Sequence, residues 1–188
     1  DLKLAEKLTA EGFQDEAEGL LKYMKGNYSG FDYGQYAAVA GRKLSEIYLE
    51  RAGQYRRQNR YDNALLTYSV AFALDKNDPD IIRGIADCYS KLNKTDTTVA
   101  FFQKEYAAAP NDPYINYALG YCYSLRGTSG SSAGKRYMTA AVNYLNRSLE
   151  LNGNLKYSYL TLSYCYEALY HIGLKEAEDQ TERNILLK

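Results

Sequence analysis

Few side chains in this sequence could act together in catalysis or metal binding. His171 is the single histidine, so neither a histidine metal cluster nor a Ser–His or Cys–His pair with a spare histidine can be assembled. We expect it to be exposed or partly packed near a helix end. Carboxylates are plentiful, but no pair lies in an apolar setting that would suit acid–base catalysis. The sequence therefore predicts a protein that is not an enzyme and needs no metal or cofactor.

The string GSSAGK at 130–135 resembles a phosphate-binding loop but fails its requirements. The first glycine is one residue too close to Gly134, and Arg136 stands where Ser or Thr is needed. No predicted strand precedes the string. Nucleotide binding is therefore not favoured.

The three cysteines, Cys88, Cys122 and Cys165, are spaced by 34 and 43 residues. Equivalent positions on neighbouring helices lie about 8–10 Å apart, which is beyond the reach of a disulfide. We expect three free thiols that fill the core.

The cysteine spacing belongs to an internal repeat. Tyrosines recur at the same 34- and 43-residue intervals, each preceded three places earlier by a small residue: Tyr55, Tyr89, Tyr123 and Tyr166, after Ala52, Ala86, Gly120 and Ser163. A second series of mostly alanines follows downstream, at Ala17, Ala64, Thr98, Ala141 and Ala177. Repeats of this length indicate a solenoid of supersecondary units.

Each unit has the pattern of two amphipathic helices. Ile82, Ile85 and Tyr89 fall on one helical stripe, and Phe102 marks the next helix after the polar break NKTDT. The prolines lie at unit borders, where a missing backbone N–H costs little: Pro79, Pro110 and Pro113. No long period-two alternation suggests a sheet.

These strings resemble the tetratricopeptide repeat (TPR) family. RYDNALLTYSVAFALDKND at 60–78 is especially similar, and the register continues for about 140 residues across four units. Arg51, Glu105 and Asn116 depart from the family pattern at single positions. The resemblance implies an all-α fold: a right-handed superhelical solenoid of antiparallel helix pairs, with about four full repeats and a partial N-terminal one.

The expected organisation is one TPR domain over 1–188. It comprises a partial repeat, an insert with a helix extension, and four repeats: 1–26, 27–44, 45–78, 79–112, 113–155 and 156–188. The stretch at 26–34 is turn-rich and precedes one long first helix at 35–58. The Gly/Ser-rich insert at 126–139 is expected to be a mobile loop.

In such a solenoid the first helices line a concave groove. The groove positions lie about 140° around the helix from the core stripe. In the first two full repeats they are largely charged: Glu46, Leu49, Gly53 and Arg56, then Asp80, Arg83, Asp87 and Ser90. In the last two they are aromatic or apolar: Tyr114, Tyr117 and Tyr121, then Tyr157, Leu160 and Tyr164.

The main hypothesis is a scaffold that binds a peptide or protein segment in this groove. Arg56, Arg83 and Asp87 would recognise charge, and the aromatic positions would supply the anchors. The alternative for the tyrosines is that they pack between neighbouring first helices or against the long Gly/Ser-rich loop. The Lys/Asn/Arg set that clamps chaperone C-termini in other TPR modules is absent at the corresponding positions.

Composition excludes two partner classes. Lys and Arg number 23 and balance 23 Asp and Glu, so neither nucleic acid nor an anionic membrane is favoured as a partner. No apolar run is long enough for direct membrane insertion. A chain beginning with Asp suggests a processed or excised fragment, so its compartment is unknown. Two other functions stay open: an assembly segment of a larger protein or homo-oligomer, and a small-molecule or lipid carrier.

Overall fold

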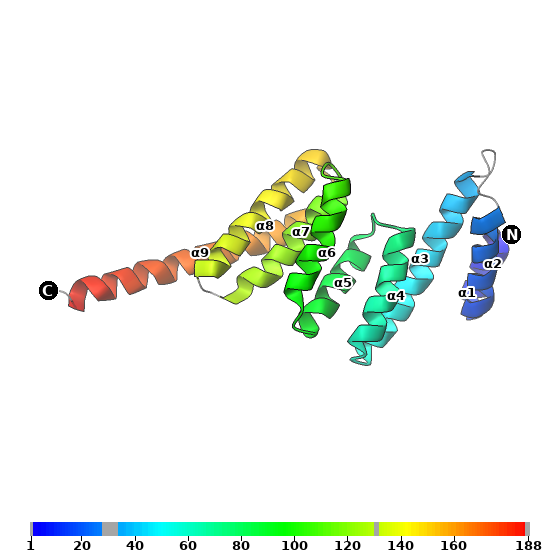
Figure 1. The fold of residues 1–188 in the computed structure, drawn as a ribbon, viewed down its shortest axis with the longest axis horizontal. Coiled ribbons are helices and arrows are strands. Elements are labelled where there is room, and N and C mark those ends of the chain that lie inside the picture. Colours follow the sequence, from blue (N-terminus) through cyan, green and yellow to red (C-terminus); the bar gives the residue numbers. More distant parts are fainter. Residues whose placement is uncertain (1, 28–33, 130–131, 187–188) are drawn as a thin grey trace. The chain divides into compact units, whose positions relative to one another are not determined.

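The computed structural model describes residues 2–27, 34–129 and 132–186, and within them the chain is helical apart from short turns (Figure 1). Two compact units are formed, Asp1–Leu92 and Asn93–Lys188. The predicted all-α fold of TPR-like helix pairs is confirmed. Most of the expected turn-rich stretch at 26–34 lies outside the described residues.

The first unit is a series of five helices in which each packs on the next. They are α1 (Leu2–Ala10), α2 (Gln14–Asn27), α3 (Gly34–Arg57), α4 (Tyr61–Leu74) and α5 (Pro79–Lys91). The 24-residue α3 is the long first helix expected from the sequence. Its N-terminal half packs on α1 and α2 around a cluster of buried apolar side chains, which includes Leu21, Met24 and Leu44.

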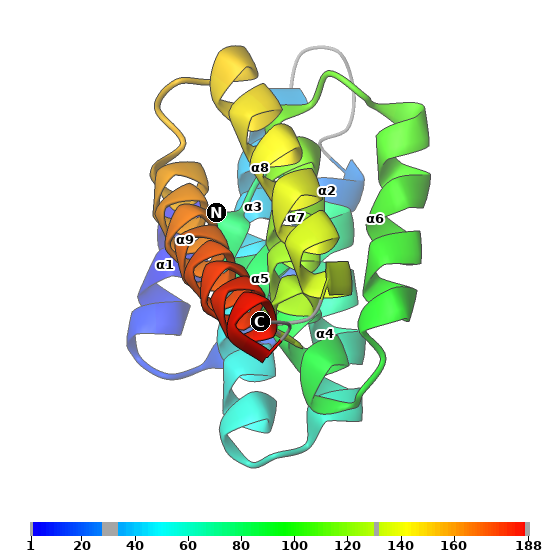
Figure 2. The ribbon, with the colours of Figure 1, turned by 90° about the vertical axis from the view of Figure 1, so that its left-hand side faces the viewer.

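The second unit contains four α-helices and a short 3-10 turn. They are α6 (Thr95–Ala108), α7 (Pro113–Arg126), η1 (Gly127–Ser129), α8 (Ser132–Leu151) and α9 (Lys156–Leu186). The pair α7 and α8 packs most extensively, and α9 packs on α8 and α7. Figure 2 looks along α9 and shows α8 beside it.

Matching residues start α5 and α7. Pro79 and Pro113 occupy the first turn of these helices, where no N–H is needed. The carboxylates of Asp78 and Asp112 accept hydrogen bonds from the next free backbone N–H groups, at 2.8 Å in both helices. The repeat boundaries are therefore encoded locally.

The helix ends are also encoded locally. Gly12, Asn59 and Asn93 have φ angles of 88°, 58° and 57°. Glycine and asparagine adopt this left-handed conformation most readily, and here it closes a helix. Each lies four residues after a signature position, namely Leu8, Tyr55 or Tyr89.

The prediction of a helix pair in the last repeat is wrong, because residues 156–186 form one 31-residue helix. The position four residues after Tyr166 is Tyr170, which does not favour the left-handed turn. The helix continues along α8 instead, and packs on it. An ion pair of 2.6 Å between Lys135 and Glu176 joins the start of α8 to the extension of α9.

The prediction of a mobile loop at 126–139 is also wrong, because this insert is mostly helical. After η1 the chain enters α8 at Ser132, which makes α8 20 residues long. Tyr137 stacks on Tyr123 at 6.3 Å between ring centroids, and the Arg126 guanidinium lies 4.2 Å from the Tyr137 centroid. Met138 is fully buried against Gly127, where a Cβ would meet it at 2.6 Å. These contacts stabilise the helical conformation of a segment whose composition suggested a loop.

All three cysteines are buried and none forms a disulfide, which confirms the thiol prediction. Burial raises the pKa of Cys88 and Cys165 to about 11. They are therefore packing residues and not nucleophiles.

Candidate functional site

The charged positions predicted for the groove converge on one cleft in the first unit. The cleft has a volume of about 320 Å³ and lies along α3 and α5. Six of the eight predicted positions line it: Leu49, Gly53, Arg56, Asp80, Arg83 and Asp87. The structure therefore brings together residues about 30 positions apart in the sequence.

Opposite charges balance along the cleft. Arg56 donates to Asp87 at 3.2 Å and so joins α3 to α5. Arg83 lies 3.6 Å from Asp80, one turn earlier on the same helix. The side chains of Arg56 and Arg83 are 45% and 41% exposed. Both ion pairs are therefore open to solvent and to a ligand.

Two close-packed residues form the wall behind these charges. The ring of Tyr68, from α4, is buried and lies directly against the backbone of Gly84. A Cβ at Gly84 would be 2.4 Å from ring atoms, so only glycine fits without a shift. Burial raises the pKa of Tyr68, and the phenol stays neutral at physiological pH. The wall is close-packed and uncharged.

A second cleft of about 340 Å³ lies on the α1 side of α3. Lys43 and Glu46 line it, and Glu50 lines both clefts. Lys43 lies 3.4 Å from Glu46 and 3.8 Å from Glu6 of α1. First helices α1, α3 and α5 thus border consecutive clefts, as expected for the inner face of TPR-like pairs.

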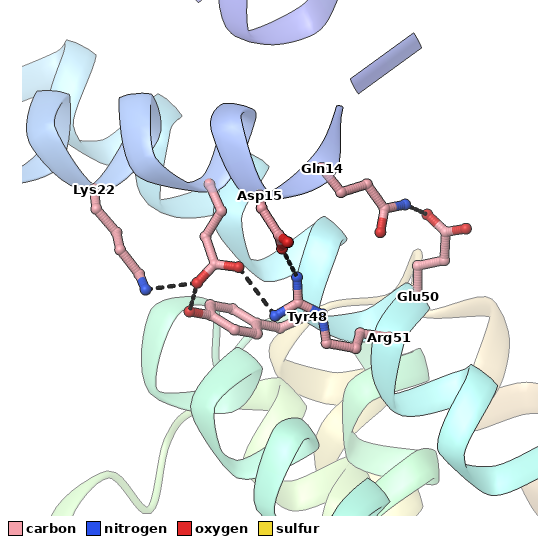
Figure 3. Close-up of polar contacts among 7 residues, drawn as sticks. Gln14, Asp15, Lys22, Tyr48, Glu50 and Arg51 are labelled. Atoms are coloured by element: carbon pink, nitrogen blue, oxygen red, sulfur yellow. Dashed lines mark hydrogen bonds and ion pairs between the residues drawn. The ribbon is translucent and has the colours of Figure 1, made fainter. Parts of the chain in front are cut away.

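A polar network that the sequence did not predict fixes α3 on α2 (Figure 3). At its centre is Glu18, a carboxylate with only 12% of its side chain exposed. It accepts from the hydroxyl of Tyr48 at 2.6 Å, pairs with Arg51 at 3.0 Å and also pairs with Lys22. The signal was present, because Arg51 stands where the family pattern has Leu.

The network determines the charge state of Glu18. Burial alone would raise its pKa, but hydrogen bonds from Lys22 and Tyr48 and the charge of Arg51 outweigh burial and lower it. Glu18 is therefore ionised at neutral pH. Two further contacts cross the same helix pair, from Arg51 to Asp15 at 3.1 Å and from Gln14 to Glu50 at 3.2 Å. The second holds a side chain that borders both clefts.

The aromatic positions predicted for the groove lie on α7 and α9 of the second unit. Tyr114, Tyr121 and Tyr157 are half-buried. Leu160 and Tyr164 are 59% and 45% exposed. Leu160 and Tyr164 are therefore the two predicted positions on α9 at which a ligand could reach apolar side chains.

Tyr117 has a different environment from the other tyrosines. Its side chain is 0% exposed. Its ring centroid lies 6.0 Å from that of Tyr121 and 6.3 Å from that of Tyr157. It fills the space between α7 and α9, so the packing alternative applies to it. The expectation that Tyr117 contacts a ligand is wrong for this conformation.

The described residues offer neither a metal site nor a membrane-spanning helix. In residues 2–27, 34–129 and 132–186, no three His, Cys, Asp or Glu side chains could together hold a metal ion. Among the helices described, none combines the length and apolarity needed to cross a membrane. His171 is exposed as expected, but it lies in the middle of α9 and not near a helix end; its ring centroid is 5.7 Å from that of Tyr170.

No protein-family model matches the chain, and no curated protein matches it in sequence. Among solved structures, it is similar to the Yersinia enterocolitica type III secretion chaperone SycD in complex with a peptide of the translocator YopD. The TM-score is 0.44 and the identity 17%, over 70% of this chain and 93% of SycD. For PcrH from Pseudomonas aeruginosa the TM-score is 0.45 and the sequence identity is 12%, over 70% of this chain and 92% of PcrH. Similarity at this level is too low to support a statement about function.

Proposed function

We propose that this protein is a non-enzymatic scaffold that binds an extended or helical peptide segment of another protein. The observation that carries the proposal is the cleft between α3 and α5. Its charged side chains come from groove positions of two successive first helices, and its wall is close-packed. A pre-formed surface of this kind binds without paying a large ordering cost.

The exposed ion pairs favour a ligand that carries both charges. A solvent-exposed pair contributes only about 0.2–1 kcal/mol, so a ligand carboxylate can replace Asp87 at Arg56 with little loss. In the same way, a ligand ammonium group can take the place of Arg83 at Asp80. The cleft therefore suits a peptide of alternating charge and gives no net preference for an acidic or basic one.

The exposed surface of α9, in the second unit, would be a separate apolar site for a peptide. Leu160 and Tyr164 are exposed and lie one turn apart on the same side of the helix. Tyr121 and Tyr157 form its half-buried border. Aromatic side chains of this kind contribute strongly at protein interfaces. A small-molecule carrier is less favoured, because charged side chains line both clefts of the first unit.

The test is selection from a random peptide library displayed on phage, followed by titration of the selected peptides. The variant Arg56→Ala/Arg83→Ala should bind them about two- to thirtyfold more weakly, because two exposed pairs of about 0.2–1 kcal/mol each are lost. Arg60→Ala is the matched control, because Arg60 is exposed and lies over the Tyr55 ring at 4.8 Å, outside the cleft. Circular dichroism establishes that each variant is folded.

Charge reversal gives a sharper result. Selection repeated on Arg56→Glu/Arg83→Glu should enrich more basic peptides than selection on the wild type. If selected peptides bind the Arg56→Ala/Arg83→Ala variant as tightly as the wild type, the cleft is not the binding site.

A further inference from the structure

Helix α9 has an exposed face that none of the groove positions explains. Tyr159, Tyr166 and Tyr170 are 54%, 52% and 65% exposed. At 100° per residue they lie about 120° around the helix from Leu160 and Tyr164. Cys165 and Ser158 of the same helix are buried and mark a third direction, toward α7 and α8.

Equivalent positions are covered by a helix in the other repeats. In α7, the residue that corresponds to Ser163 is Gly120, which is buried against Leu145 of α8. The residue that corresponds to Tyr166 is Tyr123, whose ring stacks on Tyr144 of α8 at 5.6 Å. Because α9 continues straight, it has no following helix of its own repeat to cover this face within the described residues.

The exposed face has the spacing of a coiled-coil seam. Its residues recur at alternating steps of four and three, and all of them are exposed: Tyr159, Ser163, Tyr166, Tyr170, Gly173 and Ala177. This 3.5-residue period keeps a stripe facing a partner helix over several turns. We name these six residues the α9 seam.

The α9 seam is also self-complementary. Suppose that the α9 helices of two copies lie antiparallel, related by a two-fold axis near position 168. The large residues of one seam then face small residues of the other or stack on its tyrosines. Tyr159 then faces Ala177, Ser163 faces Gly173, and Tyr166 faces Tyr170 of the second copy. The steps of four, three, four, three and four are the same in both directions, which an isologous two-fold contact requires.

We propose that the α9 seam pairs with the α9 seam of a second copy of this chain, antiparallel and across a two-fold axis. This goes beyond peptide binding, because it uses a different face of α9. Three half-exposed tyrosines and the small residues between them offer roughly 400–500 Å² per copy. The total is at the low end for specific interfaces, so the dimer has micromolar affinity.

The first test is sedimentation equilibrium from about 1 to about 500 µM, a range that brackets micromolar affinity. The wild type should pass from monomer to dimer. Tyr166→Glu/Tyr170→Glu should weaken the dimer more than about tenfold, because it places four carboxylates at the centre of the contact. Tyr164→Glu is the control: it adds a carboxylate to the same helix outside the seam and should keep the dimer. Helicity of each variant is measured by circular dichroism.

The second test decides orientation by disulfide trapping. Ser163→Cys and Gly173→Cys are prepared separately; a Cβ at Gly173 meets no atom within 4 Å, so cysteine fits there. Oxidation of the mixture should give a linked heterodimer, and each variant alone should stay largely unlinked. The native cysteines are buried and do not compete.

Three results would overturn the proposal. The first is a wild type that stays monomeric over the whole range. The second is a dimer that Tyr166→Glu/Tyr170→Glu leaves unchanged, because the contact then lies elsewhere. The third is efficient linking of Ser163→Cys with itself, which indicates a parallel pair. None of these results bears on the cleft variants, so the proposed function is tested separately.

Discussion

Replacing Tyr117 with alanine separates packing from ligand contact more sharply than any other single change. If Tyr117 were a ligand anchor on an exposed groove, the protein would keep its stability and lose binding. Because the side chain is 0% exposed and lies between the rings of Tyr121 and Tyr157, we expect a large loss of stability instead.

The magnitude follows from the buried area. A tyrosine side chain buries about 150–250 Å². At about 25 cal/mol per Å² this corresponds to about 4–6 kcal/mol for the whole side chain. Alanine retains part of it, so Tyr117→Ala should cost about 3–5 kcal/mol, as for other aromatic-to-alanine changes in cores. For a chain of this size the midpoint of thermal unfolding should fall by roughly 6–20 °C.

The assay is urea unfolding followed by circular dichroism, with thermal unfolding beside it. Tyr164→Ala is the matched control, since the same atoms are removed from a side chain that is 45% exposed. It should cost about 1 kcal/mol or less. A Tyr117→Ala variant as stable as Tyr164→Ala would show that Tyr117 is not part of the core in solution, and the packing argument would fail.

Three further predictions concern the first unit. Glu18→Gln should destabilise the protein by about 1–3 kcal/mol near neutral pH, because a charged hydrogen-bond acceptor is lost. The pKa of Glu18 is lowered by folding, so its contribution is present above the ordinary value of 4.5 and is lost as the pH falls through the lower folded value. Urea unfolding of both proteins should therefore differ near neutral pH and converge in acid; a constant difference would contradict the network. Gly84→Ala should cost about 1–3 kcal/mol because its Cβ would enter the Tyr68 ring, whereas Gly53→Ala, whose Cβ would meet only an Arg57 nitrogen at 3.5 Å, should be neutral or stabilising by up to about 1 kcal/mol. Equal unfolding midpoints for the two alanine variants would refute the close contact. Cys88 should react with iodoacetamide far more slowly in the native protein than in urea, since burial raises its pKa to about 11; rapid native labelling, measured by mass spectrometry, would show that α5 opens.

Much of the site could be predicted from helical register alone. Counting from the signature tyrosines gave the charged positions on α3 and α5, and the structure collects most of them in one cleft. The Glu18 network could not be predicted in this way. Arg51 breaks the family pattern, but its partner lies 33 residues earlier, and the pattern does not identify it.

The aromatic positions show the limit of the same method. Register places Tyr117 and Tyr164 on one stripe, yet one is fully buried and the other is 45% exposed. The difference arises because α9 covers Tyr117, whereas Tyr164 lies on the outer helix itself. The position of a residue on a stripe predicts the direction in which its side chain leaves the helix axis. The packing of neighbouring helices determines how much of that side chain is exposed.

By itself, the sequence determined where α5 and α7 begin and where α1, α3 and α5 end. Caps and turns depend on local backbone chemistry: Asp before Pro starts a helix, and Gly or Asn at a left-handed position ends one. Only the tertiary structure decided that the Gly/Ser-rich insert is helical, because Tyr137 and Met138 gain their stabilisation from residues of α7 and η1. Helix propensity contributes less than about 1 kcal/mol per residue, so the close packing of a large side chain against its neighbours can override it.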